Sequence, residues 1–432
     1  MSKKVGFVTL GCKVNIYESN ALKNELEAKG FEIGDANEVC DAYVINTCSV
    51  TNMADAKSRK MIRKCIKTNP DAVVCAMGCY TQTNNEAREI PGVDVLIGNG
   101  NKKEAIDRLC EMVESGDHSN KYVNIIDILD NHEYEPLGVT TYDHTRAFVK
   151  IEDGCENFCT YCIIPYARGP VRCKDPDEVI DELNRICDNG YLEVVLAGIH
   201  TGRYKVGDTN LSALVKRILN EVPRLERLRL SSIEINEVDD EFIELMKNNK
   251  ILANHLHLPL QSGSDLILSK MERKYDSQFF IDKVKKIREA RPDCSITTDI
   301  IVGFPYETEE EFMETYNFSK EIGFAKIHVF PYSVRRGTKA EKMPQVNDTV
   351  KKERATRLIA LSHELEEEYA KGFIGKTLDL IVEHATADGQ MIGHTSNYLQ
   401  IVLPLDENLI GKNVKAKLLY EENGRIIGEL CD

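Results

Sequence analysis

The chain has 432 residues, with 55 Lys and Arg against 70 Asp and Glu, and so carries a formal charge of −15 at pH 7. A composition that is 42% hydrophobic and 29% charged is typical of a folded protein of about two to four domains and excludes a disordered or fibrous chain. The acidic balance excludes binding of nucleic acid through a broad basic surface, but not binding of one shaped RNA through a local patch. No apolar run reaches the roughly 18 residues needed to cross a bilayer, and the first residues do not resemble a signal peptide, so we expect a cytoplasmic protein with no membrane partner.

Short buried strands and amphipathic helices alternate over residues 1–114. Strands are expected at 5–10, 42–46, 72–77 and 93–97, and helices at 17–29 and 55–67. This alternation predicts a small doubly wound α/β domain with a parallel sheet. Residues 115–144 lose the periodicity and are rich in Asp, Asn, His and Gly, so we expect a linker there.

The alternation resumes over residues 145–372. Strands are expected at 147–151, 193–197, 227–231, 255–260, 295–302 and 325–330, separated by helices at 177–189, 210–220, 239–247, 276–290 and 307–322. Six such units predict a parallel sheet curved into a partial (β/α)6 barrel with its helices outside, followed by a long charged helix at 348–371. In residues 373–432, short strands at 378–383, 398–402 and 414–419 between Asp-Gly, Gly-Lys and Asn-Gly turns predict a small antiparallel β-barrel.

Fourteen cysteines in a large chain of this kind are more informative as metal ligands than as a disulfide framework. Cys155, Cys159 and Cys162 lie within one loop after the first strand of the middle domain. Three thiolates on a four-iron cluster leave one iron without a protein ligand, and an open metal position is what a catalytic centre needs. A zinc site that borrows a distant ligand, or three incidental cysteines, are the alternatives.

Three other cysteines occupy equivalent places in the N-terminal domain. Cys12, Cys48 and Cys79 each lie just past the carboxyl end of a predicted strand, where parallel sheets bind ligands. We predict that the topology gathers them around a second cluster, again with three protein ligands; three separate buried cysteines are the alternative.

Cys173 adds a thiol near the first triad without an assigned role, and we expect the remaining cysteines to be structural: Cys40, Cys65, Cys75, Cys110, Cys187, Cys294 and Cys431.

The Cys-x3-Cys-x2-Cys spacing resembles that of the radical S-adenosylmethionine superfamily. The resemblance implies that the open iron binds S-adenosylmethionine and that one electron from the cluster splits it into methionine and a 5′-deoxyadenosyl radical. Side chains and backbone at the strand ends would hold the cofactor, because active sites of such barrels collect on that rim. The candidates are Tyr161, Gly198, Glu234, Gln261, Ser262 and Gly303.

Segments 9–15, 46–52, 78–80 and 153–169 together resemble the methylthiotransferases, a two-cluster radical family with a C-terminal TRAM domain. Within it, Lys13-Val14-Asn15 and Val50-Thr51-Asn52 resemble the branch that acts on carbon 2 of N6-threonylcarbamoyladenosine beside the tRNA anticodon. The resemblance implies two [4Fe-4S] clusters, each held by one cysteine triad, so that all six cysteines are catalytic. One S-adenosylmethionine would methylate sulfur at the N-terminal cluster, and a second would supply the radical.

The partners implied by this resemblance are a tRNA carrying threonylcarbamoyladenosine, an electron donor such as flavodoxin or ferredoxin, and a sulfur donor of unassigned identity. A basic helical face after Cys48 is the candidate RNA contact, with a solvated helix face as the alternative. The C-terminal barrel has 5 Lys and Arg against 9 Asp and Glu, a net charge of −4, so RNA binding there depends on the resemblance and on one aromatic residue. The candidate RNA-binding residues are Arg59, Lys60, Arg63, Lys64, Lys67 and Tyr398.

Other functions stay open at this point. The nearest is methylthiolation of isopentenyladenosine or of a ribosomal-protein aspartate. A non-catalytic iron–sulfur protein that binds RNA, and a one-cluster radical enzyme with inert N-terminal cysteines, are further alternatives. Arg168 and Arg172, after the middle-domain triad, could orient cofactor or substrate or form a structural salt bridge.

Overall fold

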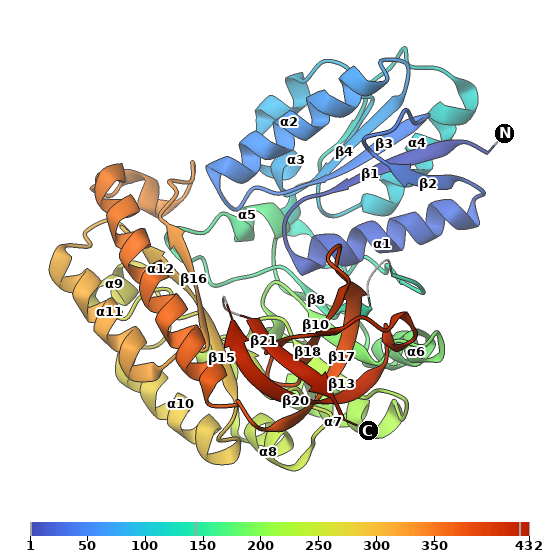
Figure 1. The fold of residues 1–432 in the computed structure, drawn as a ribbon. Coiled ribbons are helices and arrows are strands. Elements are labelled where there is room, and N and C mark those ends of the chain that lie inside the picture. Colours follow the sequence, from blue (N-terminus) through green and yellow to red (C-terminus); the bar gives the residue numbers. More distant parts are fainter. Residues whose placement is uncertain (1, 143–144, 423–424, 432) are drawn as a thin grey trace.

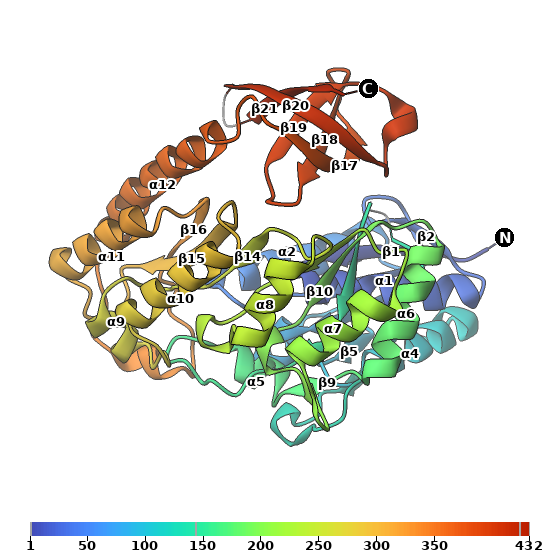
Figure 2. The same cartoon turned by 90° about the horizontal axis from the view of Figure 1, so that it is seen from below.

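The computed structural model describes residues 2–142, 145–422 and 425–431, which form three units in chain order (Figure 1). The N-terminal unit lies beside a central partial barrel, and a long helix leads from that barrel to a small C-terminal barrel. Figure 2 shows the C-terminal barrel lying over one side of the central unit. Within the described residues, no helix combines the length and the apolar character that crossing a membrane requires.

A six-stranded parallel sheet forms the N-terminal unit, in the order β2-β1-β3-β4-β5-β6. Helices α1 and α4 cover one face and α2 and α3 the other, which buries β3 and β4 completely and explains their continuous apolar sequence. The strands are β1 (Lys4–Thr9), β2 (Glu32–Asp35), β3 (Ala42–Thr47), β4 (Val73–Gly78), β5 (Val95–Ile97) and β6 (Tyr122–Asn124). The helices are α1 (Lys13–Ala28), α2 (Asn52–Thr68), α3 (Cys79–Thr83) and α4 (Lys102–Ser115).

The doubly wound N-terminal domain predicted from the sequence is confirmed, with the four predicted strands found to within two residues. The sequence predicted a linker at 115–144, and its described part, residues 115–142, packs against the N-terminal unit. Its strand β6 pairs with β5, and Leu137 and Val139 are buried in the N-terminal core. A strand of three residues is too short to produce a readable alternation, so the sequence pattern did not reveal it.

The central unit is the predicted partial barrel, built from two three-stranded parallel sheets. β7-β10-β13 form one and β14-β15-β16 the other, and a bridge between Leu228 and Leu252 joins them. The strands are β7 (Arg146–Lys150), β10 (Glu193–Ala197), β13 (Arg227–Leu230), β14 (His255–His257), β15 (Ser295–Val302) and β16 (Lys326–Pro331). The outer helices are α6 (Pro176–Asp188), α7 (Leu211–Glu221), α8 (Asp240–Asn248), α9 (Asp265–Lys270), α10 (Ser277–Ala290) and α11 (Glu309–Ile322).

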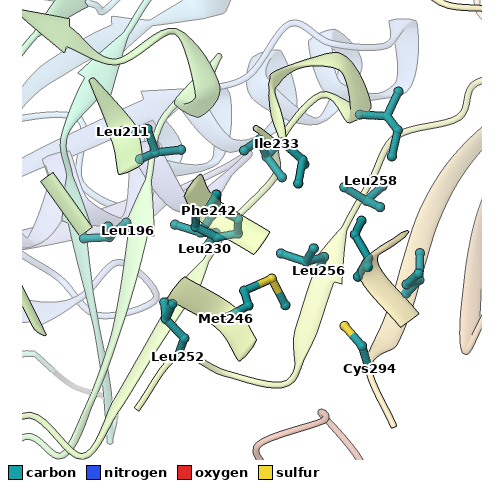
Figure 3. Close-up of a cluster of buried hydrophobic side chains, with 14 of the residues drawn as sticks. Leu196, Leu211, Leu230, Ile233, Phe242, Met246, Leu252, Leu256, Leu258 and Cys294 are labelled. Carbon is teal, nitrogen blue, oxygen red and sulfur yellow. The ribbon is translucent and has the colours of Figure 1, made fainter. Parts of the chain in front are cut away.

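Apolar side chains from these strands and helices meet between the two layers (Figure 3). Leu230 and Leu256 on the strands face Phe242 and Met246 on α8, and all four are at most 3% exposed. Cys294 points into the same core, as expected for a structural cysteine. Val149 and Ile151, which precede the central cysteine loop, belong to the same core.

The C-terminal unit is a closed five-stranded barrel in the order β17-β18-β19-β21-β20, reached through α12 (Asp348–Lys371). The sequence predicted an antiparallel barrel; four of the pairs are antiparallel, but β19 and β21 pair in parallel. The strands are β17 (Thr377–Ala385), β18 (Gln390–Thr395), β19 (Gln400–Pro404), β20 (Asn413–Glu422) and β21 (Arg425–Leu430). This barrel is tied to the central unit, since Arg229 donates to the backbone carbonyls of Thr395 and Ser396 at 3.3 and 3.2 Å.

Candidate functional site

The N-terminal cysteine triad lies at the carboxyl edge of the six-stranded sheet. Cys12 follows β1, Cys48 follows β3 and Cys79 follows β4, and these three strands are neighbours. The order of connection reverses between β1 and β3, which is the point where open α/β sheets bind ligands. A Cβ atom built on Gly11 would lie 3.2 Å from the Cys48 sulfur, so the first two loops touch.

Two glycines allow this close approach. Gly11 and Gly78 have φ angles of +105° and +102°, in a region that side chains disfavour. A Cβ atom on Gly78 would also lie 2.6 Å from Asn46 Oδ1 and 2.8 Å from the Thr47 carbonyl oxygen. Any larger residue would strain the backbone and push the strand ends apart, so the glycine before each of two cysteines has a steric role.

The buried carboxamide of Asn15 ties two of the loops together. Its Nδ2 donates to the carbonyl oxygens of Leu10 at 2.7 Å and Thr47 at 3.0 Å. Its Oδ1 lies 3.6 Å from the Cys12 sulfur. Because one side chain bonds to the segments before Cys12 and Cys48, it fixes their relative position.

Burial and repulsion between sulfurs raise the pKa of two thiols in this triad, Cys12 and Cys48. Burial, followed by the charges of Cys79 and Cys12, raises the pKa of Cys48 to about 11. Burial likewise raises the pKa of Cys12, against the opposing effect of the Arg168 guanidinium. The three sulfurs therefore lie within electrostatic range of one another, and a cationic metal centre would offset the cost of ionising them.

The central triad lies in the loop between β8 (Glu152–Asp153) and α5 (Ile164–Arg168). The Cys162 N–H donates to the Cys159 carbonyl oxygen at 2.9 Å, which closes the second half of the loop. Phe158 has a φ of +47°, so the chain turns through the left-handed region between Cys155 and Cys159. Burial raises the pKa of Cys155 and, with repulsion from Cys159, raises that of Cys162 to about 12.

Two side chains not foreseen from the sequence contact the sulfurs of this triad. His200 Nδ1 lies 3.6 Å from Cys155 Sγ, and Arg273 Nη1 donates to Cys159 Sγ at 3.4 Å. His200 follows β10 on the rim that carries the cysteine loop, which is a signal that could have identified it. Arg273 lies between two outer helices and has no comparable signal.

Three of the six candidate cofactor residues lie near the central triad. Tyr161 and Gln261 line a cavity that also includes Cys162. Gln261 has a φ of +66°, another left-handed position on the rim. Glu234 forms a salt bridge with Arg273, and Arg273 in turn contacts the Cys159 sulfur, so Glu234 is linked to the triad through Arg273.

The other three candidates have different neighbours. Ser262 is fully buried and shares a hydrogen bond of 3.1 Å with Thr315 Oγ1 on α11. The Gly303 N–H donates to Glu307 Oε1 at 2.7 Å, and a Cβ atom on Gly198 would meet Glu152 Oε2 at 2.7 Å. These three positions lie outside the lining of the cavity beside Cys162.

A cavity of about 190 Å³ lies between the loop that carries Cys48 and the loop that carries Cys162. Its walls come from both loops and from the ends of β15 and β16, so the N-terminal sheet edge faces the mouth of the central barrel. The lining residues are Val50, Thr51, Tyr161, Cys162, Ile163, Ile164, Gln261, Asp299, Ile301, Phe330, Pro331, Tyr332, Ser333 and Arg335.

Arg335, just after β16, joins the central barrel to the loop of Cys48. Its guanidinium donates to Asp55 Oδ2 at 2.8 Å, to Ser49 Oγ at 3.0 Å and to Asn52 Oδ1 at 2.8 Å. Three bonds to one loop hold the N-terminal triad at a fixed place relative to the barrel mouth.

A buried ion network joins the same two units behind the cavity. Arg168 Nη1 donates to Glu18 Oε1 at 2.9 Å and to Asp153 Oδ1 at 3.0 Å. Lys102 and Lys150 lie 3.2 and 3.3 Å from Glu18 Oε1, and none of these five side chains is more than 4% exposed. Arg168 thus forms a structural salt bridge, and its positive charge also lies near the N-terminal triad.

This network predicts a dependence of stability on acid. Burial alone would raise the pKa of Glu18, but Arg168, Lys102 and Lys150 outweigh it and lower the pKa from 4.5 to about 2. Because the folded pKa is below the unfolded one, this carboxylate stabilises the fold above about pH 4.5, and the contribution is lost as the pH falls towards 2. We expect the melting temperature to fall less steeply with acid in Glu18→Gln than in the wild type, measured by calorimetry. Equal slopes would contradict this assignment.

The basic candidates for RNA contact lie on α2. Lys60, Arg63, Lys64 and Lys67 are exposed, and within the described residues none of them forms a salt bridge with a carboxylate. Arg59 differs, since its guanidinium lies 5.7 Å from the centre of the Tyr80 ring. The free charges form an exposed basic face on the helix that follows Cys48.

Tyr398 lies in the junction between the two barrels, where it faces the central unit. Its ring stacks on His255 with centroids 5.0 Å apart, and the Arg229 guanidinium lies 4.7 Å from the ring centre. Arg146 Nη1 donates to its hydroxyl at 3.1 Å. The exposed part of this ring therefore lines a cavity between domains.

The donor sets suit iron–sulfur clusters better than single zinc ions. All fourteen cysteines are free of disulfide bonds. Among the described residues, His257, Asp299 and His328 have three ligand atoms that all lie within 4.8 Å of one another, but neither cysteine triad does. In each triad at least one pair of sulfurs is therefore farther apart than that. The sulfurs of thiolates bound to one tetrahedral zinc lie about 3.8 Å apart, which is shorter than the largest sulfur–sulfur distance in either triad. The Cys173 sulfur accepts a hydrogen bond from the Lys205 N–H at 3.4 Å.

Comparison with known proteins agrees with this architecture. Residues 149–319 match the Radical SAM superfamily, and residues 4–98 match the family described as Uncharacterized protein family UPF0004. The solved structure of the radical S-adenosylmethionine methyltransferase TsrM from Kitasatospora setae has a TM-score of 0.57 and 15% identity, covering 91% of this chain and 81% of that one. At that identity the likeness shows the fold alone.

Curated relatives match along nearly the whole chain. The threonylcarbamoyladenosine tRNA methylthiotransferase MtaB of Bacillus subtilis is 46% identical over 96% of this chain and 93% of its own length. MtaB of Aquifex aeolicus is 38% identical, over 92% and 96%. The tRNA-2-methylthio-N(6)-dimethylallyladenosine synthase of Clostridium perfringens is 33% identical, over 100% and 99%. Membership of the radical superfamily implies one [4Fe-4S] cluster and S-adenosylmethionine. The chain is therefore a transferase that belongs to the radical S-adenosylmethionine methylthiotransferase family.

Proposed function

We propose that this protein transfers a methylthio group to carbon 2 of N6-threonylcarbamoyladenosine next to the anticodon of tRNA. The observation that carries the proposal is the 46% identity, along nearly the whole chain, to a relative named for that reaction. It is supported by a cavity that Cys162 of the central triad lines together with Val50 and Thr51, which follow Cys48. Carbon 2 of an adenine bears an unactivated hydrogen that acid–base catalysis does not remove at useful rates. A radical enzyme is suited to this position.

Each triad would hold one [4Fe-4S] cluster with three thiolates, which leaves one iron of each without a protein ligand. When bound, the clusters and two molecules of S-adenosylmethionine would supply the radical and the methylated sulfur. Cys155, Cys159 and Cys162 would bind the first cluster, and Cys12, Cys48 and Cys79 the second. The physiological reductant would be a low-potential protein such as flavodoxin or ferredoxin.

The chain's own residues have clear tasks in this scheme. Tyr161 and Gln261 line the cavity beside Cys162 and would contact the cofactor there. Arg335 would keep the N-terminal triad beside the barrel mouth, since it bonds to the loop of Cys48. The exposed basic face of α2, with Lys60 and Arg63, would bind tRNA phosphates close to the cavity.

Two measurements test the proposal together. Anaerobically reconstituted wild type should hold about eight irons per chain, and a variant lacking Cys155, Cys159 and Cys162 about four. With reductant, sulfide and S-adenosylmethionine, the wild type should convert threonylcarbamoyladenosine in tRNA to its methylthio derivative, detected by nucleoside mass spectrometry. Four irons in the wild type would remove the second cluster from the proposal.

The 33% identity to a dimethylallyladenosine synthase makes isopentenyladenosine the appropriate competitor. The same assay with tRNA carrying isopentenyladenosine should give little product. In cells, the corresponding test is to analyse the nucleosides of tRNA from a strain that lacks this gene. Loss of only the methylthiolated isopentenyl nucleoside would overturn the substrate assignment.

A further inference from the structure

A second cavity, of about 260 Å³, lies inside the central barrel where all three units meet. Lys13 enters it from the N-terminal unit, directly after Cys12, and Tyr398 enters from the C-terminal barrel. Strands of both central sheets supply the other walls. The lining residues are Lys13, Arg146, Phe148, Val195, Arg229, Ser231, His255, His257, Thr297, Lys326, His328 and Tyr398.

This cavity adjoins the first cavity, the one beside Cys162, at Asp299. The Asp299 carboxylate lines the first cavity, and its Oδ2 lies 3.3 Å from Nε2 of His257, which lines the second. The two cavities are therefore neighbours, and the substituent of a base bound in the first would have to pass this ion pair to reach the second. The two cavities together resemble a site for a base and for the group attached to it.

Four Lys and Arg side chains line this cavity, and among the described residues three of them have a carboxylate partner. Arg146 pairs with Glu383 at 3.2 Å, Arg229 with Glu193 at 2.9 Å and Lys326 with Glu366 at 3.0 Å.

Lys13, by contrast, has no hydrogen bond or salt bridge within the described part of the chain. An ammonium that lines a cavity with no carboxylate in salt-bridge contact favours an anionic ligand there.

A second polar side chain at this junction has a ring nitrogen without a hydrogen-bond partner among the described residues. His255 is 7% exposed, and its Nδ1 has no hydrogen-bond partner, while its Nε2 is paired with Thr297 Oγ1 at 3.0 Å. Hydroxyl groups of Ser231 and Thr297 and the apolar Phe148 complete the lining. A ligand with an anionic end, polar hydrogen-bonding groups and a short apolar part would satisfy all of these.

We propose that this cavity is the specificity pocket for a carboxylate-bearing substituent of the target adenine, and that Lys13 binds the carboxylate. The inference rests on the proposed function and adds to it the basis of substrate choice. An uncharged isopentenyl group would leave Lys13 unpaired, which gives the pocket a reason to reject it. A divalent cation at His257, Asp299 and His328 is disfavoured, because the positively charged Lys13 lines the same cavity as the two histidines.

The test compares an acid with its uncharged ester. Reconstituted wild type is titrated calorimetrically with the nucleoside N6-threonylcarbamoyladenosine and with its methyl ester, and both are compared as substrates within a tRNA anticodon stem-loop. We expect the acid to be preferred by about 10- to 100-fold in affinity and in kcat/KM. Lys13→Met should lose that preference through a higher Kd and KM for the acid, and Lys13→Arg should recover part of it.

Controls separate this role from a structural one. Lys29→Met, just beyond the other end of α1, removes a lysine paired with Asp107 and should keep the wild-type preference. Iron content and 5′-deoxyadenosine formation by Lys13→Met should match the wild type, because Cys12 is intact. A wild type that ignores threonylcarbamoyladenosine would overturn the proposed function, whereas a Lys13→Met protein that keeps the preference for the acid would overturn this inference alone.

Discussion

Replacing Cys48 with alanine is expected to abolish methylthiolation while leaving the reductive cleavage of S-adenosylmethionine intact. Cys48 belongs to the N-terminal triad, and the central triad does not depend on it for ligands. A cluster with one of three protein ligands removed should be lost on isolation, so the iron content should fall from about eight to about four per chain. The measurements are iron and sulfide counts, 5′-deoxyadenosine yield and methylthio nucleoside yield from one preparation.

Cys110→Ala is the matched control for this experiment. Cys110 lies in the same domain, on α4, and packs in the apolar core away from the sheet edge. Alanine is a strong helix former, so the substitution should leave the helix intact and all three measurements unchanged. If Cys48→Ala kept the wild-type iron content and product yield, the N-terminal cysteines would be inert and the enzyme would have one cluster.

Replacing Arg168 with methionine is expected to destabilise the protein by about 3 kcal/mol, because two buried carboxylates lose the guanidinium that they share. Arg168 donates to both Glu18 and Asp153 at 2.9 and 3.0 Å, and Lys150, which also contacts both carboxylates, lies farther from each at 3.3 Å. The methionine is of similar length, so the loss would come from charge more than from packing. Calorimetric unfolding of the reconstituted protein measures the effect.

A surface salt bridge gives the comparison for this result. Arg217 pairs with Asp177 and Glu221 on the exposed side of α7. Its replacement by methionine should barely change the melting temperature, because exposed pairs contribute little. If Arg168→Met were as stable as the Arg217 variant, the buried network would not hold the two units together.

The sequence alone predicted the three units and the placement of the six cysteines at strand ends, since both follow from periodic apolar runs and parallel topology. It did not predict β18 or β21, because Gly393 and Gly428 interrupt short mixed segments that show no alternation. Helix α1 begins at Lys13, four residues before the predicted start at 17. Its cap residue Cys12 makes no side-chain capping bond, so tertiary bonds from Asn15 fix this first turn.

The surroundings of the cysteines were harder to predict than the cysteines themselves. His200 and Arg273 contact the central sulfurs from distant segments. Asn99 Nδ2 lies 3.4 Å from the Cys79 sulfur and comes from beyond β5. Contacts of this kind depend on how separate loops meet in three dimensions, which no local pattern reports. Tyr398 was predicted to stack on RNA, and its placement between domains follows from the same kind of long-range packing.

The three bonds made by Arg335 have a consequence for modular exchange. The loop that carries Cys48 is completed by a guanidinium from a position 287 residues later in the chain (335 − 48). The N-terminal segment therefore does not contain all the residues that position its cysteines, although its own residues form its sheet and its core. A chimera that joins it to a foreign barrel would have to recreate that arginine at the end of the sixth strand, or the transplanted sheet edge would lose its alignment with the barrel mouth.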